Sequence, residues 1–160
     1  MKIFMSSTIN KIDSKGRVSI PSVFRSVLEY QGFPGVYIYP SFTSQAIDGG
    51  GQILIDQIAE SVEKMQLFAE ETDALTTALF SDTFQIPYDQ DGRISLPEPL
   101  IVHANLKDKV TFAGLGQKFQ MWEPEAFKEF KSHARLKALE NRDLIGPALN
   151  TDSKLSKESE

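Results

Sequence analysis

The stretch "DSKGRVSIP", residues 13–21, returns as "DQDGRISLP" at residues 89–97. The two copies share Asp, Gly, Arg, Ser and Pro, and they differ by exchanging Val for Ile and Ile for Leu. Each copy follows a short β-type run and leads into a segment opened by proline. We interpret the pair as an internal duplication. This decides the fold, because a repeated unit that cannot bury its own apolar face packs on its neighbour.

The composition is that of an ordinary soluble globular protein. The chain has 160 residues, of which 41% are hydrophobic and 24% are charged. Two units of about 45 residues would each be too small for a self-sufficient core. We therefore expect the two copies to pack on each other, on helices or on other subunits.

Cysteine is absent from the chain. Disulfides, thiolate metal sites and a cysteine nucleophile are thereby excluded, which is consistent with a reducing compartment. The N-terminal "MKIFMSSTINK" has no apolar stretch of signal-peptide length, and no run reaches membrane-spanning length. We expect a cytoplasmic protein with no membrane partner.

Charge is distributed unevenly along the chain. The net charge of −5 argues, on its face, against a nucleic-acid partner. Residues 1–35 nevertheless carry five basic and two acidic residues, a net charge of +3. Residues 36–80 carry one basic and seven acidic residues, a net charge of −6. The first motif therefore lies in a basic segment that a strongly acidic one follows.

The first copy predicts two short strands, at 8–12 and 17–20, joined by the turn "DSKG". Asp can accept hydrogen bonds from backbone amides inside a turn, and Gly adopts positive φ without steric cost. Pro21 ends the second strand because it cannot donate to a ladder. A helix with Ser22 as N-cap and Gly32 as its stop follows, and then a strand "VYIY" with "FTSQAI" as its return partner.

The "DGGG" stretch, residues 48–51, is predicted to be a turn into the next helix. It lacks the Lys-Ser/Thr and the glycine spacing of a phosphate-binding loop. Apolar spacing predicts helices from about residue 55 and again over "ETDALTTALF", an acidic pair that bridges the two copies.

The second copy is expected to repeat the plan of the first. We predict strands at 83–88 and 93–96 around the turn "DQDG", a turn of helix in "PLIVHA", and the strands "VTFAG" and "FQMW". A helix opened by Glu123-Pro124 follows. From about Asp143 the sequence is polar and predicts a disordered tail.

Groups that would indicate an enzyme are missing from the sequence. His103 and His133 lie 30 residues apart and share no metal-ligand pattern. Asp13 and Asp89 could form an acid–base pair, but their placement ahead of a glycine is better explained by turn chemistry. No nucleophile signature is found. We expect no catalytic residue, metal, cofactor or small-molecule substrate.

Arg17 and Arg93 each follow an aspartate by four residues at the start of a strand. One interpretation is an Asp–Arg ion pair that pins the turn. The other is a rigidly mounted guanidinium, whose planar fork suits phosphate or guanine edges. Both interpretations can hold together, because an aspartate does not occupy all five arginine donors.

The chain resembles the MraZ family on these motifs. "DSKGRVSIPSVFR", "DQDGRISLP", "TALF" and "VTFAGLGQKFQMWEPEAF" carry the resemblance over residues 4–138. It implies an α+β fold, mainly β with bridging helices, made of tandem AbrB-type swapped-hairpin barrels that are double-ψ-like. The expected parts are a first unit at 7–54, a helical linker at 55–82, a second unit at 83–126, a C-terminal helix at 127–142 and the tail at 143–160.

The resemblance also implies a function. It predicts a sequence-specific DNA-binding transcriptional regulator, a repressor of the bacterial division and cell-wall gene cluster that binds short repeats in its own promoter region. The partners would be double-stranded DNA and further copies in a ring-like homo-oligomer, and the protein would be nucleoid-associated. The predicted DNA-binding residues are Lys11, Lys15, Arg17 and Arg25, and the motif and turn residues are Asp13, Gly16, Asp89, Gly92 and Arg93.

The second copy departs from the family pattern at Ile101, where the family often has an arginine. We therefore expect the first unit to be the main DNA face, with basic segments added together around the ring. Two alternatives stay open at this point. One is a protein-binding assembly or antitoxin-like module, and the other is a small enzyme.

Overall fold

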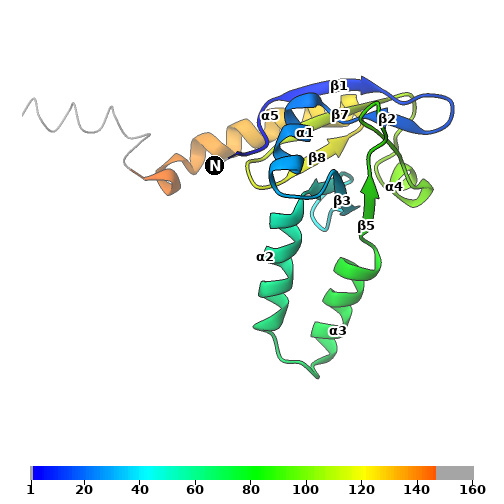
Figure 1. Ribbon diagram of the computed structural model, residues 1–160. Helices are drawn as coiled ribbons and strands as arrows, with labels where there is room; N and C mark the ends of the chain where they lie inside the picture. Colours follow the sequence, from blue (N-terminus) through cyan, green and yellow to red (C-terminus); the bar gives the residue numbers. More distant parts are fainter. Residues whose placement is uncertain (1, 147–160) are drawn as a thin grey trace, which may run out of the picture. The chain divides into compact units, whose positions relative to one another are not determined.

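Both copies of the motif form a strand, a tight turn and a second strand. In the computed structural model, which describes residues 2–146, the first copy joins β1 (Ser7–Lys11) to β2 (Arg17–Ser19) (Figure 1). The second copy joins β5 (Phe84–Pro87) to β6 (Arg93–Ser95). The predicted turn chemistry is confirmed, because Gly16 and Gly92 have φ of 76° and 74°.

The rest of each repeat follows one plan. A helix capped by proline leads into two further strands, so each repeat reads strand, strand, helix, strand, strand. The first repeat continues with α1 (Ser22–Tyr30), β3 (Gly35–Pro40) and β4 (Ile47–Gly50). The second continues with α4 (Glu98–His103), β7 (Lys109–Gly114) and β8 (Phe119–Trp122).

The strands of the two repeats interleave in one antiparallel sheet. Its order is β1-β7-β8-β4-β3-β5, and β2 pairs with β6 in a separate two-stranded ribbon. Exchanging each strand for its repeat partner leaves this order unchanged. The register obeys the same exchange: Thr8 pairs with Phe112 and Phe84 pairs with Ile38, and both Thr8 and Phe84 precede the motif aspartate by five residues. The duplication read from the sequence is therefore also a pseudo-twofold relation in space.

The predicted α+β fold with mainly antiparallel strands is confirmed. The resemblance implied one barrel for each repeat, and here the structure differs, because the strands of both repeats share a sheet and no separate barrel forms within residues 2–146. The reason is size: a unit of about 45 residues buries too little surface on its own. The first compact unit extends to Pro124, and a second begins at Glu125.

The core lies between the sheet, the ribbon and the two short helices. Four phenylalanines at its centre meet mostly edge to face, with ring centroids 5.1–6.2 Å apart. Val18 and Ile94 reach this core from the ribbon, and α1 contributes its apolar face. The phenylalanines are Phe4, Phe24, Phe112 and Phe119.

The predicted "DGGG" turn is wrong, because Ile47–Gly50 form the central strand β4. A Cβ on Gly49 would lie 2.6 Å from a ring carbon of Phe119, so the strand needs glycine for close packing rather than for a turn. The predicted cap at Ser22 is also wrong. Pro21 is the N-cap residue of α1, and its carbonyl accepts the amide of Phe24 at 2.9 Å.

A polar network is buried where β4 pairs with β8. Asp48, 5% exposed, accepts hydrogen bonds from Gln120 at 2.9 Å and from Lys118 at 3.1 Å. Burial, and secondarily the Asp48 charge, raise the pKa of Tyr39 to about 12. Both Asp48 oxygens have partners, so the buried carboxylate is satisfied.

The helical bridge extends away from the sheet as two helices (Figure 1). It comprises α2 (Gln52–Glu63), α3 (Glu70–Thr76) and the π-helix η1 (Thr77–Ser81). Apolar side chains from both arms line a cleft of about 240 Å³. At the tip between the arms, Leu67 and Phe68 are 74% and 94% exposed.

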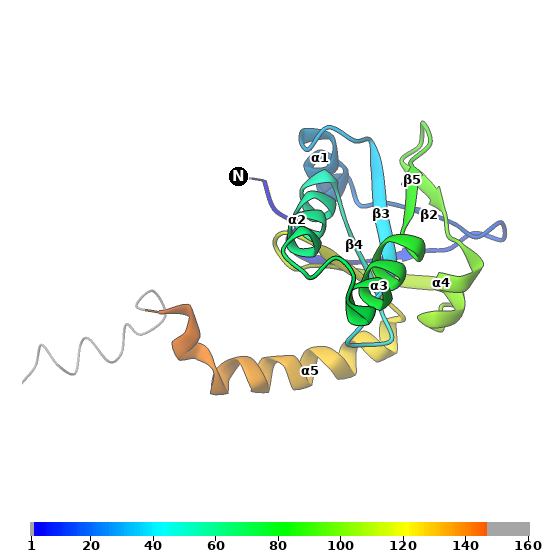
Figure 2. The same cartoon turned by 90° about the horizontal axis from the view of Figure 1, so that it is seen from below.

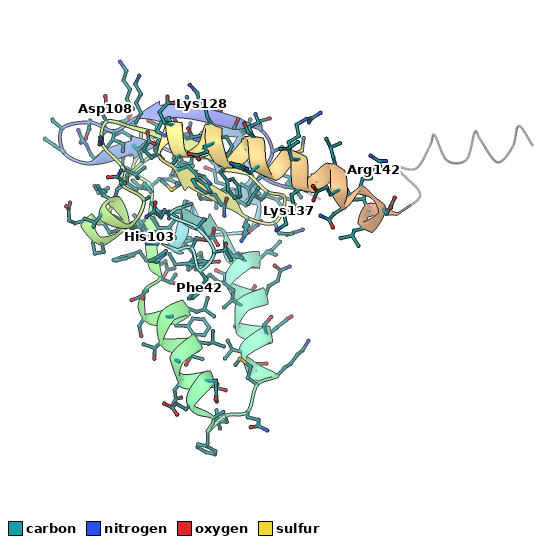
Figure 3. All side chains as sticks on the ribbon, turned by 180° about the vertical axis from the view of Figure 1, so that it is seen from behind. Phe42, His103, Asp108, Lys128, Lys137 and Arg142 are labelled. Carbon is teal, nitrogen blue, oxygen red and sulfur yellow. The ribbon has the colours of Figure 1, made fainter. Side chains whose placement is uncertain are left out.

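The second unit contains α5 (Pro124–Glu140) from its second residue onward and the short 3-10 helix η2 (Arg142–Ile145). Figure 3 shows Lys128 and Lys137 extending from α5. The tail was predicted from residue 143, but residues 143–145 belong to η2, and residues 147–160 lie outside the described part. No helix within residues 2–146 is long and apolar enough to cross a membrane.

Candidate nucleic-acid interface

The β2–β6 ribbon brings the two motif arginines onto one surface. Val18 pairs with Ile94 at its centre, and both side chains are buried. Because side chains alternate along a strand, the flanking residues point the other way. The outer face of the ribbon is therefore formed by Arg17, Ser19, Arg93 and Ser95.

The first turn holds Arg17 through Asp13. One Asp13 oxygen accepts the backbone amides of Lys15 and Arg17, both at 2.9 Å. The other accepts Nε of Arg17 at 2.7 Å. The Arg17 amide is the main reason that the pKa of Asp13 lies below its usual value, and the Arg17 side chain adds to this. The ion pair that the sequence suggested is present, and it leaves the outer nitrogens of the guanidinium available.

The second turn repeats this arrangement with one difference. Asp89 accepts the amides of Asp91 and Arg93 and binds Nε of Arg93 at 3.1 Å. The pKa of Asp89 is again lowered, mainly by the Arg93 amide. Asp91, which stands where the first turn has Lys15, also binds Nη2 of Arg93 at 3.2 Å. The second turn is therefore less basic, and its arginine has fewer free donors.

Of the other predicted DNA-binding residues, two lie at or beside the first turn, and Arg25 contacts the second turn. Lys15 is exposed within the first turn, and Lys11 is exposed at the end of β1. Arg25 is half-buried on α1, where its Nε donates to the carbonyl of Ile20 at 3.2 Å. Its guanidinium lies against Gly92 of the second repeat.

One basic neighbour was missed by reading the sequence. Lys109 is exposed and lies directly across from Lys11 in the β1–β7 pair. Like charges in directly opposed positions destabilise a sheet, so this pair would favour an anionic ligand. No local signal could reveal it, because the two lysines are 98 positions apart.

The two histidines belong to different compact units. His103 lies on α4 in the first unit (Figure 3), with a buried Nε2 that forms no hydrogen bond to a described residue. His133 lies on α5 in the second unit. Among residues 2–146 no group of three or more His, Asp or Glu side chains could hold a metal ion.

Comparison with known proteins gives consistent matches. Residues 79–144 match the family described as "MraZ protein, putative antitoxin-like". A protein of Pelagibacter ubique is 44% identical over 88% of this chain and 90% of its own length. Proteins of Rickettsia bellii and Beijerinckia indica are 38% and 42% identical, over 89% and 84% of this chain and 95% and 82% of theirs. All three are named "Transcriptional regulator MraZ".

Proposed function

The chain belongs to the MraZ family, and from this premise we propose that it is a transcriptional regulator that binds double-stranded DNA with the outer face of the β2–β6 ribbon. The regulatory role rests on the relatives, which are named transcriptional regulators. One observation supports the DNA-binding face more than any other: Arg17 and Arg93 come from different repeats and lie on one exposed surface.

The chemistry of this face suits DNA. The major groove admits a two-stranded ribbon, and arginine can donate two hydrogen bonds to the O6 and N7 atoms of guanine. Asp13 and Asp89 orient the guanidinium groups through Nε, so little side-chain entropy is lost on binding. Lys11 and Lys15 would contact phosphates, which position the protein without reading sequence.

The finer parts of the proposal rest on family membership. We infer repression of the bacterial division and cell-wall gene cluster from short repeats in the protein's own promoter region. A cytoplasmic, nucleoid-associated location follows from DNA binding. No catalytic role forms part of the proposal.

Self-association is the second part of the proposal. The cleft between α2 and α3 is apolar and open, and Phe68 is almost fully exposed at the tip of the same hairpin. Exposed apolar surface of this kind marks interaction sites. We propose a further copy of this chain as the occupant, in a head-to-tail contact that closes into a ring. The cleft is lined by Leu54, Gln57, Ile58, Ser61, Val62, Met65, Leu75 and Leu79.

A ring would reconcile DNA binding with a net charge of −5. Each copy brings a first segment of net charge +3, and linked weak contacts gain through effective concentration. The acidic helices would lie away from the DNA.

The proposal is tested with the DNA upstream of the protein's own coding sequence, against a scrambled fragment of equal length. Fluorescence anisotropy at several salt concentrations would give both affinities. We expect tighter binding to the upstream DNA and a linear fall of log affinity with log salt concentration. Equal, weak binding to both fragments at physiological salt would contradict the proposal.

A protein-binding, antitoxin-like role is the second candidate. It is favoured by the family description and by the net charge of −6 over residues 36–80, which suits a basic protein partner. Retention of a protein partner by a chain that fails to bind any DNA would support this role over the first.

A further inference from the structure

Arg25 connects the first repeat to the turn of the second. A Cβ placed on Gly92 would lie 2.5 Å from Nη1 and 2.7 Å from Cζ of Arg25, so the guanidinium covers that glycine closely. Nε of Arg25 donates a hydrogen bond to the carbonyl of Ile20. The amide of Ile20 in turn donates to the carbonyl of Gly92 at 2.9 Å. One end of the second turn is thereby fixed to the first repeat.

Glu29 holds the other end of the same turn. It lies one helical turn after Arg25 on α1 and accepts a hydrogen bond from the Tyr88 hydroxyl at 2.6 Å. Tyr88 directly precedes the motif residue Asp89. Partial burial, together with the Glu29 carboxylate, raises the pKa of Tyr88 to about 12.

The first turn shares the backbone contact, because the Leu96 amide donates to the carbonyl of Gly16 at 2.9 Å, but it lacks the side-chain contacts. Arg25 aligns with Ile101 and Tyr88 aligns with Ile12, whereas α4 ends at His103, before any position equivalent to Glu29. Neither isoleucine side chain can donate or accept a hydrogen bond. A Cβ on Gly16 would meet nothing within 4 Å. The two turns project from different edges of the unit (Figure 2), and within residues 2–146 only the second is held by side chains of the other repeat.

We infer that Arg25 and Glu29 are positioning residues that clamp the second turn, so that Arg93 is fixed before DNA binds while the first turn adjusts to the DNA. This inference rests on the proposed DNA-binding function. A preorganised group loses less entropy on binding, whereas an adaptable one follows local differences in groove shape. Arg25 would then act through Gly92 and Arg93, and would not itself contact DNA.

Hydrogen exchange in the DNA-free protein tests the clamp directly. The amides of Gly16 and Gly92 each donate to the aspartate carbonyl of their own turn, so they form a matched pair of reporters. Arg25→Ala is expected to accelerate exchange at Gly92 roughly threefold to tenfold, the effect of losing about one hydrogen bond. Gly16 is expected to stay unchanged. Val23→Ala, at an exposed position on α1, is the control.

A double-mutant cycle tests whether Arg25 acts through Arg93. Arg25→Ala should weaken binding to the upstream DNA when Arg93 is present, and should have less than about a twofold effect in the Arg93→Ala background. In the Arg17→Ala background its full effect should persist. The salt dependence should not change, because no phosphate contact is lost. Additivity with Arg93→Ala together with a shallower salt dependence would overturn the inference in favour of direct DNA contact.

Two further variants keep the test valid if Arg25→Ala does not fold. Glu29→Gln and Tyr88→Phe loosen the other end of the turn without leaving a large cavity, and both should accelerate exchange at Gly92. Unchanged exchange in both would overturn the clamp. If the wild-type protein binds no DNA, the proposed function fails, whereas the exchange measurements still decide whether the clamp exists.

Discussion

Arg17 and Arg93 lie on the same face of one antiparallel ribbon, on either side of the buried Val18–Ile94 pair. Their surroundings nevertheless differ. Among the described residues Arg17 forms an ion pair with Asp13 alone, whereas Arg93 pairs with Asp89 and also with Asp91. Two guanidinium groups in equivalent places are thus left with different numbers of free donors, and we expect unequal contributions to DNA binding.

Removing Arg17 should weaken binding to the upstream DNA by roughly 1–3 kcal/mol if it reads a base edge. Arg93→Ala should have a smaller effect, because Asp91 already occupies one of its terminal nitrogens. Lys15→Ala should weaken binding to all DNA alike and reduce the salt slope by about one. Anisotropy titrations on the three variants, with melting temperatures as a control for folding, check these expectations.

The proposed DNA face would be contradicted if Arg17→Ala and Arg93→Ala lowered the melting temperature while the folded variants kept the wild-type affinity for the upstream DNA. In that case the motif would serve only to build the turns.

Asp13 and Asp89 should make stability depend on acid pH. The pKa of each carboxyl is lowered in the fold, so the ionised form favours the folded state. This contribution is complete above the unfolded-state pKa of about 4 and is lost as pH falls through the lower folded-state value. Asp13→Asn should therefore lower the melting temperature at neutral pH and flatten its acid dependence, as scans between about pH 2.5 and 6 would record. An unchanged acid profile would exclude this role for Asp13.

Alanine should be tolerated differently at the two turn glycines. Both have positive φ, which costs a non-glycine residue about 1–2 kcal/mol. At Gly16 the added methyl group meets open space, whereas at Gly92 it would also displace the Arg25 guanidinium. Urea denaturation should therefore show a larger loss of unfolding free energy for Gly92→Ala than for Gly16→Ala. Equal losses would mean that Arg25 moves aside freely.

Gly49→Ala should destabilise the protein by roughly 1–3 kcal/mol, the usual result of overpacking a core. The added Cβ would lie 2.6 Å from the Phe119 ring. Phe119→Leu, which removes ring atoms at that contact, should be less harmful in the Gly49→Ala background than alone. Chemical denaturation of the two single variants and the double variant measures this coupling, and simple additivity would count against the contact as the cause.

Self-association should depend on the tip of the α2–α3 hairpin. Light scattering with size exclusion should give a mass well above 17.9 kDa for the wild-type chain. Phe68→Ser should lower this mass, because it removes the most exposed of the large apolar side chains in the described part of the molecule. Val102→Ser, at a 68% exposed position on α4, is the control. A monomeric wild-type chain at micromolar concentration would contradict the ring.

Local chemistry in the sequence predicted the turns and most strands, because Asp-x-x-Gly and short β-branched runs act over a few residues. It failed at Gly49 and Gly50, whose composition favours a turn while close packing against Phe119 and Leu54 requires glycine in a strand. That packing depends on a ring 70 positions away, which local reading cannot include.

Local contacts of the candidate site could be predicted from the sequence, whereas contacts between the repeats could not. The Asp13–Arg17 and Asp89–Arg93 pairs could be anticipated from their spacing of four residues. The contact of Arg25 with Gly92 could not, because it joins segments that meet only after the two repeats interleave.

The pairing of β4 with β8, and of β2 with β6, would be the self-paired contacts of a symmetric dimer if the repeats were separate identical chains. In such a dimer every substitution would appear in both halves at once. Joining the halves in one polypeptide removes that constraint, so Arg25 can be gained on one side while Ile101 stands on the other. The pseudo-symmetric fold can therefore acquire a directional surface one residue at a time, with its symmetric backbone unchanged.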